Sequence, residues 1–414
     1  MDRGLFEKAW DQIDPVDLRI LLDEHFGGPG QYADREAEAH RFYLPLAGSS
    51  CRVTLTFVGP RIVAIEPGPA FDPLTWTAFQ EDVEASCLSG RAVVAREYAF
   101  SSFRVPGFWR GEHSGVQILP PHPEAPVAEV ELAEHPFILE FPILHSSRPG
   151  LVNHRRFRVH RRLARLLNLL LVGRVSYHPR QVRHLWATDR SAEPARIKWV
   201  QEFYFAPLGE PVTSTLSTPT FEPLQELPPD QYQRLLGHDG KPLRVPADLD
   251  ANVLRYLHLP TEQRRSLDRA TFWLDLASRQ WYSSISASFA ALVSAVEALT
   301  DRGSRHGFDC PVCGQKTSHE VPGATRRFRE FFEMFAPGDS FRRQRGIMYA
   351  LRSGILHGST LMQFDEAHDF GWDPPGWHER ELHSDLWVLT RAALRRWLAR
   401  IPDREGESRD SSAA

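Results

Sequence analysis

Hydrophobic and polar positions divide the chain into two patterns. In the first 225 residues, apolar side chains occur in short β-rich runs punctuated by Gly and Pro, such as CRVTLTFVG at 51–59, RIVAIEPG at 61–68, AVVAREYAF at 92–100 and FILEFPIL at 137–144. Runs of this kind predict neighbouring strands. Helical apolar spacing at 5–26 and a further segment at 73–89 predict helices between them. We therefore expect residues 1–225 to form an α+β domain with a mainly antiparallel sheet, in a sensor or recruitment role.

From about residue 261 the pattern changes to helical periodicity. It is clearest over residues 283–300, where one stripe is formed by Ile285, Phe289, Leu292, Val293, Val296 and Leu299. Further amphipathic segments predict helices at 262–280, 325–335, 340–356 and 381–400. We therefore expect a C-terminal all-α helical bundle over residues 261–401. Residues 226–260 are predicted to be a linker and connecting segment, and 402–414 a disordered tail.

Composition and charge narrow the class of protein. Hydrophobic residues make up 42% of the 414 residues and charged residues 25%, which is typical of globular domains. The net charge of −4 argues against binding of nucleic acid through bulk charge. No apolar run approaches the roughly 20 residues that span a bilayer, the first residues do not resemble a signal peptide, and four cysteines cannot form a disulfide framework. We expect a cytoplasmic protein without a membrane partner.

A strongly basic helix is predicted at residues 154–172. Its arginines are Arg155, Arg156, Arg158, Arg161, Arg162 and Arg165. They could grip a phosphate backbone. The alternative is a solvated helix face whose leucines pack inward, namely Leu163, Leu166, Leu167 and Leu170. Because charge runs are more often solvated faces, we adopt the second interpretation.

The candidate chemistry lies in the sequence FRRQRGIMYALRSGILHG, which carries Arg352 and His357 near the end of a predicted helix that Gly358 is placed to cap. The two side chains are about 140° apart around the helix, but a long Arg near a helix end can reach towards the His. An imidazole can move a proton near neutral pH, and a guanidinium offers paired donors to a phosphate. This chemistry suits metal-independent cleavage of RNA. The alternative is that Arg352 makes an ion pair and His357 favours the helix dipole.

Two spaced motifs resemble the HEPN superfamily, most closely its Apea-like branch. The first is an apolar helix that ends in Glu297-Ala298-Leu299, and the second carries Tyr349, Arg352, Ser353 and His357 followed by Gly. The resemblance covers about residues 261–401. It implies a HEPN-like bundle of four to five helices that forms a homodimer through its motif helix.

The resemblance also implies an activity. Members of this superfamily include metal-independent endoribonucleases of prokaryotic antiviral defence and toxin–antitoxin systems. By position, Arg352 and His357 would be the catalytic pair, with Ser353, Tyr349 and Glu297 in support. Active members often carry Asn, Asp or His directly after the Arg, where this chain has Ser353. Other members only bind nucleotides or partners, so a non-catalytic module that binds nucleic acid or a protein partner is the alternative.

A Cys-Pro-Val-Cys-Gly segment predicts a zinc knuckle within the bundle. Cys310 and Cys313 have the spacing of two zinc ligands, and His306 and His319 are the local candidates for the other two. With four protein ligands the zinc would be structural, because no position would be open for catalysis. A redox-active pair and two unliganded cysteines are the alternatives.

Further arginines precede the motif, in two groups: Arg326, Arg327 and Arg329, then Arg342, Arg343 and Arg345. They predict a basic groove for RNA if they share a face, and solvated helix surfaces if they do not. The sequence contains no P-loop, no G-x-G-x-x-G after a strand, no G-x-S-x-G and no H-E-x-x-H. These absences disfavour common nucleotide-dependent enzymes and hydrolases.

Overall fold

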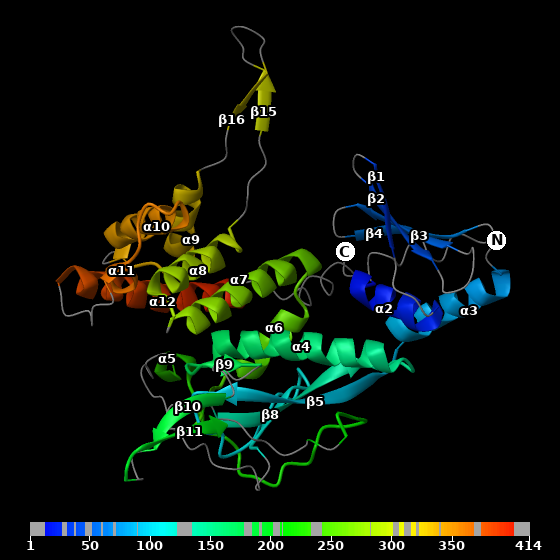
Figure 1. The fold of residues 1–414 in the computed structure, drawn as a ribbon, viewed down its shortest axis with the longest axis horizontal. Coiled ribbons are helices and arrows are strands. Elements are labelled where there is room, and N and C mark those ends of the chain that lie inside the picture. The colour runs from blue at the N-terminus through cyan, green and yellow to red at the C-terminus, as the bar shows by residue number, and fades with distance from the viewer. Residues whose placement is uncertain are drawn as a thin grey trace, which may run out of the picture. The chain divides into compact units, whose positions relative to one another are not determined.

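The computed structural model describes residues 13–26, 31–36, 39–45, 52–58, 61–68, 72–88, 90–121, 135–177, 184–189, 193–201, 208, 210–232, 242–281, 283–300, 306–309, 316–319, 323–338, 341–367 and 374–400. Its fold is mixed, with an antiparallel sheet and a C-terminal helical region (Figure 1). The chain forms two compact units that interleave in sequence. Unit 1 comprises 1–97, 139–161 and 208–218, and unit 2 comprises the rest. This division differs from the sequential one expected with a linker after residue 225.

Unit 1 contains a four-stranded antiparallel meander. Its strands, in spatial order, are β1 (Gln31–Glu36), β2 (Ala39–Pro45), β3 (Arg52–Val58) and β4 (Arg61–Pro67). Strands β3 and β4 were predicted from their β-branched runs, whereas β1 and β2, which are rich in charged residues, were not.

Two helices complete the core of unit 1. Helix α2 spans Pro15–Phe26, with Pro in its first turn, where a missing N–H costs nothing. Helix α3 spans Pro73–Val83, is capped by Asp72 through the amide of Thr75, and continues as a π-turn, η2 (Glu84–Leu88). Their apolar faces meet in one cluster with strand and α4 residues: Ile13, Leu18, Leu21, Leu22, Val53, Phe79, Val83 and Leu151.

A six-stranded sheet has the order β12-β5-β8-β7-β6, and β9 pairs with β5. Its strands are β5 (Ala92–Ser101), β6 (Trp109–Arg110), β7 (Gln117–Leu119), β8 (His135–Leu144), β9 (Val175–Ser176) and β12 (Val212–Thr213). The β12–β5, β5–β9 and β6–β7 pairs are antiparallel. A separate antiparallel pair is formed by β10 (His184–Asp189) and β11 (Arg196–Gln201). The predicted strands at 92–100 and 137–144 are thereby confirmed.

Helix α4 spans Pro149–Leu170, close to the basic helix predicted at 154–172. Its predicted inward-facing leucines are buried, with relative exposures of 0–4%: Leu163, Leu166, Leu167 and Leu170. Two arginines of the last helix cap its C-terminal end. Arg391 donates to the carbonyls of Asn168 and Leu171, and Arg395 donates to that of Leu169. These bonds satisfy carbonyls that have no partner within the helix.

The segment predicted as linker, residues 226–260, is instead folded into unit 2. It contains β13 (Glu226–Leu227) and β14 (Val245–Pro246), which pair in parallel, and the helices α5 (Pro229–Tyr232) and α6 (Leu249–Leu257). Buried residues of α6 include Leu249, Val253 and Tyr256. The correction follows from this apolar stripe at i, i+4 and i+7, which is typical of a packed helix.

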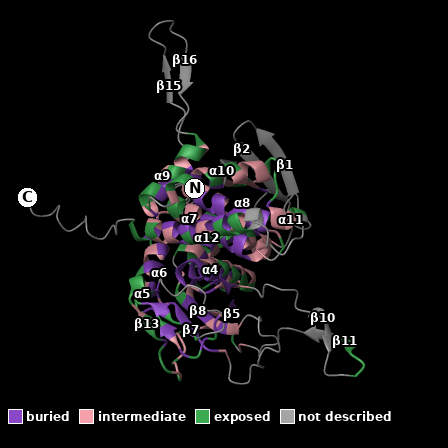
Figure 2. Cartoon of the chain, turned by 90° about the vertical axis from the view of Figure 1, so that its left-hand side faces the viewer, coloured by how far each residue is buried: buried purple, intermediate pink, exposed green. Residues whose placement is uncertain are grey.

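The C-terminal helices of unit 2 surround α8. They are α7 (Thr261–Gln280), α8 (Ile285–Glu297), α9 (Ala324–Phe335), α10 (Arg342–Leu356), α11 (Gln363–Ala367) and α12 (Pro374–Arg400). Helix α8 packs against each of the other five, and most of its residues are buried (Figure 2). Its predicted apolar stripe accounts for this position. None of the described helices is both long and apolar enough to cross a membrane.

Asp365 of α11 fixes the N-terminal end of α8. Its carboxylate accepts from the amides of Ile285 and Ser286 and from the hydroxyl of Ser284. Ser284 itself caps the helix by accepting from the Ala287 amide. These bonds satisfy free N–H groups and place a negative charge where the helix dipole favours it.

Candidate active site

The candidate site lies at the C-terminal end of α10. Gly358 follows the helix with a φ of 69°, a conformation that favours glycine. The amides of His357 and Gly358 donate to the carbonyls of Ser353 and Ile355, which closes the last turn. The predicted capping role of Gly358 is therefore confirmed. It makes His357 the C-cap residue.

Arg352 is held by a carboxylate of α8. Its Nη2 donates to Glu297 Oε2 at 2.6 Å, and the other oxygen of Glu297 accepts from the Tyr349 hydroxyl at 2.9 Å. The guanidinium carbon also lies 5.7 Å from the centre of the Tyr349 ring. The side chains of Arg352 and Glu297 are 20% and 26% exposed. The three residues therefore form a partly accessible polar cluster.

Arginines of α9 contribute to the charge around this cluster. Burial and the bonded Glu297 carboxylate raise the pKa of Tyr349, while the positive charges of Arg352 and Arg327 act in the opposite direction. Arg329 lies against α10, because a Cβ added at Gly346 would be 2.5 Å from its Nη2. Arg327 thus acts on the cluster and Arg329 lies against the same helix, whereas the basic groove for RNA stays a prediction.

His357 is exposed at the end of α10. Within the described part of the chain, its side chain makes no hydrogen bond or ion pair. The two candidate catalytic groups thus lie on one helix but are not joined by a contact, and their positions differ by about 140° around the helix axis. Ser353 is half-buried, and its carbonyl accepts from the amide of His357.

Arg345 was expected among RNA-binding residues, and this prediction is wrong. Only 1% of the residue is exposed, and its Nη2 donates to the carbonyl of Ala336, the C-cap residue of α9, and to that of Gly338. It therefore ties the α9–α10 turn together. Arg342 and Arg343 are exposed, in agreement with a surface role.

The predicted zinc knuckle falls partly outside the described residues, which include neither Cys310 nor Cys313. The flanking strands β15 (His306–Asp309) and β16 (Lys316–His319) pair antiparallel, with His306 opposite His319. The ligand set of Cys310, Cys313, His306 and His319 therefore stays a prediction. Among described residues, no group of three metal-ligating side chains occurs.

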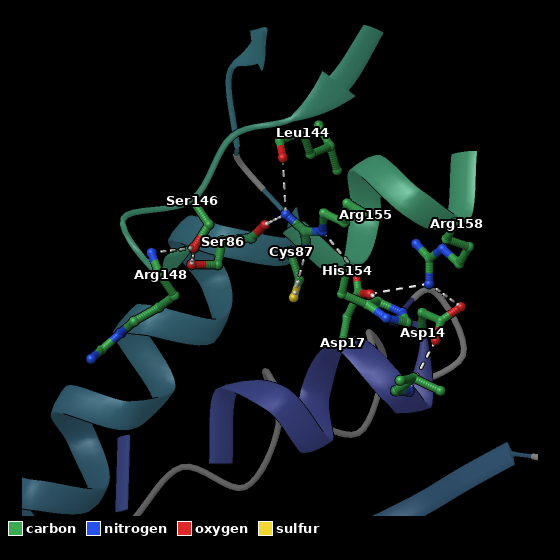
Figure 3. Close-up of polar contacts among 11 residues, drawn as sticks. Asp14, Asp17, Ser86, Cys87, Leu144, Ser146, Arg148, His154, Arg155 and Arg158 are labelled. Carbon is green, nitrogen blue, oxygen red and sulfur yellow. Dashed lines mark hydrogen bonds and ion pairs between the residues drawn. The ribbon is translucent and has the colours of Figure 1, made fainter. Parts of the chain in front are cut away.

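The basic helix α4 forms internal ion pairs, which differs from both interpretations of its arginines. In unit 1, Arg155 is 3% exposed and donates to Asp17 at 2.8 Å, to the carbonyl of Ser86 and to Cys87 Sγ (Figure 3). Arg158 bonds the other oxygen of Asp17. In unit 2, the pairs are Arg162 with Asp268 and Arg165 with Asp275. These four arginines bind carboxylates of the same chain, so they do not form a phosphate-binding face.

Sequence reasoning missed a buried histidine of α12. His383 is 2% exposed, and its Nε2 lies 2.8 Å from the Ser288 hydroxyl of α8. Its sequence context, HERELHSDLW, contains two histidines five residues apart, and periodicity is the only signal that separates the exposed His378 from the buried His383.

No protein-family model matches the chain, and neither a curated protein nor a solved structure gives a significant match.

Proposed function

We propose that the helices α7–α12 form a HEPN-like module that cleaves RNA as a homodimer without a metal. The observation that carries the proposal is the end of α10, where a guanidinium fixed by Glu297 and an exposed imidazole occupy the same helix end. Glu297 binds one terminal nitrogen of Arg352, and 20% of the arginine side chain stays exposed. The guanidinium is therefore fixed in place and partly accessible.

The reaction follows from these groups. The 2′-hydroxyl of a ribose attacks the adjacent phosphorus, so that a new O–P bond forms and the bond to the 5′-oxygen breaks. One imidazole accepts the proton of the 2′-hydroxyl, and a second protonates the departing 5′-oxygen. Arg352 binds the phosphate as negative charge builds on it. Each copy supplies one His357, so two copies supply both proton-transfer groups.

The surface beside His357 supports assembly through this helix end. Leu356 and Leu361 flank the histidine in sequence and are 54% and 46% exposed. We propose that these two side chains form part of a larger apolar surface that meets a second copy. A second copy that covers them would bring two His357 side chains and two Arg352 side chains into one cleft.

The alternative function is a non-catalytic module of the same fold that binds nucleic acid or a protein partner. The ion pair between Arg352 and Glu297 favours it, because a guanidinium bound to a carboxylate supports the fold even where no reaction occurs. Under this alternative, His357 has no chemical role.

The two functions are separated by incubating purified protein with end-labelled RNA in EDTA. We expect cleavage by the wild type and a loss of at least a hundredfold in His357→Ala and Arg352→Ala. His378→Ala and Arg19→Ala are matched controls, because both residues are exposed and belong neither to the cluster nor to the arginines predicted to bind RNA. Equal cleavage by His357→Ala and His378→Ala contradicts the proposal, and RNA binding without cleavage supports the alternative.

A further inference from the structure

A second site lies at the other end of α8, in a cavity of about 150 Å³. Its lining includes Arg174, Trp281, Ser288, His383, Ser384 and Trp387. Ser288 precedes Glu297 by nine residues, or about 13 Å of helix, so the cavity is separate from the Arg352 cluster. The side chains come from α7, α8, α12 and the segment after α4, all within unit 2. Helices α7 and α12 pack on α8 in both ribbon views (Figures 1 and 2).

The hydrogen bonds in the cavity define which ring nitrogen of His383 carries the proton. Ser288 Oγ lies 2.8 Å from the carbonyl of Ala277 and 2.8 Å from His383 Nε2. A hydroxyl has a single proton, and the carbonyl can only accept, so the serine donates to Ala277 and His383 Nε2 donates to the serine. The remaining nitrogen, Nδ1, is then an acceptor, and no described residue donates to it.

Burial keeps this histidine neutral. It lowers the pKa of His383 to about 4, so the imidazole carries no charge at neutral pH. A neutral imidazole with a free lone pair accepts a hydrogen bond from an O–H or N–H group of a ligand.

Aromatic rings form the walls of the cavity. The rings of Trp281 and His383 have centres 4.5 Å apart at an angle of 56°, and Trp387 lies beneath the guanidinium of Arg391 at 5.7 Å. A cavity of this volume holds one six-membered aromatic ring. Planar aromatic ligands gain the most binding energy from such walls, since they can stack or pack edge-on against indole rings.

The charge around the cavity is positive. Arg174 belongs to the lining, and none of the described lining residues is Asp or Glu. Burial, together with the positive charges of Arg395 and Arg174, lowers the pKa of Arg391. Arg174 and Arg395 thus both act on Arg391, and Arg174 is the guanidinium of the three that lines the cavity, where it favours an anionic ligand.

We propose that this cavity is a binding site for a small single-ring aromatic carboxylate that carries a hydroxyl or N–H donor. The ring lies between Trp281 and Trp387, the donor bonds Nδ1 of His383, and the carboxylate faces Arg174. The proposal does not rest on ribonuclease activity, because none of these residues belongs to the Arg352 cluster.

The test is calorimetric titration of the full chain with 4-hydroxybenzoate and 2-hydroxybenzoate, beside benzyl alcohol and cyclohexanecarboxylate. We expect saturable binding of at least one hydroxybenzoate, and at least tenfold weaker binding of the two comparison compounds. Arg174→Gln removes the charge and is expected to weaken binding about tenfold. Ser384→Phe fills the cavity from an exposed position on α12 and is expected to abolish binding.

Arg326→Gln is the matched control, because that arginine is exposed on α9 and outside the cavity. Circular dichroism melting curves identify any variant that fails to fold. The proposal is overturned if the wild type binds neither hydroxybenzoate at millimolar concentration. It is also overturned if folded Arg174→Gln and Ser384→Phe both bind as the wild type does.

Discussion

Arg352 Nη2 lies 2.6 Å from Glu297 Oε2, so an ion pair joins the helix that carries the candidate catalytic arginine to α8. Both side chains are mostly buried, which limits the screening of their charges by solvent. We expect Glu297→Ala and Arg352→Ala each to lower the free energy of unfolding by about 1–2 kcal/mol. The double variant should lose less than the sum, with a coupling of about 1 kcal/mol.

Denaturant unfolding of the four proteins of this cycle measures the coupling. The exposed pair Arg326–Glu330 offers a matched control, because an i,i+4 pair on the surface contributes little. Its coupling should be close to zero. Additive losses for Glu297 and Arg352 would show that their contact does not stabilise the fold.

Arg345 is a structural residue, although its neighbours in sequence are exposed. Removal of its side chain leaves the carbonyls of Ala336 and Gly338 without their donor and opens a cavity. We expect Arg345→Ala to lower the free energy of unfolding by about 2–4 kcal/mol. Arg343→Ala, at an exposed position, should change it by less than about 0.5 kcal/mol. Equal stability of these two variants in chemical denaturation would refute the assignment.

His383 gives the stability of the protein a definite pH dependence. Its pKa is about 4 in the folded chain against an ordinary value of 6.5, so between these values the unfolded chain binds more protons. The free energy of unfolding therefore falls as the pH drops from 6.5 towards 4, by up to about 1.4 kcal/mol per pH unit from this residue. In His383→Gln this contribution should be absent. If the free energy of unfolding has the same pH dependence in wild type and variant, the assignment of this contribution to His383 is wrong.

Cys87 should react slowly with alkylating reagents in the folded protein. Burial raises the pKa of its thiol from 9.0 to about 11, although the charge of Arg155 opposes the shift. Because the thiolate is the reactive form, its alkylation by iodoacetamide should rise about tenfold per pH unit from pH 8 to pH 10. Peptide mass spectrometry follows the modification. Rapid alkylation at pH 8 under native conditions would contradict the raised pKa.

The sequence predicted the elements whose signals are local. The spacing of apolar residues predicted helix α8. Gly358 predicted the end of α10, because glycine adopts a positive φ without steric strain. The strands β3, β5 and β8 were visible in their β-branched runs. These features depend on neighbouring residues alone.

The partners of charged residues could not be predicted in the same way. Arg345 and Arg343 are the same residue type two positions apart, yet one is buried and the other exposed. Helical spacing offers a signal, because Arg345, Met348, Tyr349 and Arg352 fall at i, i+3, i+4 and i+7 and share one face. That stripe also explains why Arg352 meets Glu297. The carboxylates that pair with α4, such as Asp17 and Asp268, are far away in sequence and could be identified only from the fold.

If the end of α10 cleaves RNA through attack by the 2′-hydroxyl, the chemical nature of the cleaved ends reveals it. Labelled RNA is incubated in EDTA with wild type and with His357→Ala, and the ends of the products are identified. We expect 5′-hydroxyl and 2′,3′-cyclic phosphate ends from the wild type and no cleavage of the same sequence with 2′-O-methyl groups. His357→Ala should give at least a hundredfold less product. Ends with a 5′-phosphate, cleavage that EDTA abolishes, or equal cleavage by both proteins would contradict this mechanism.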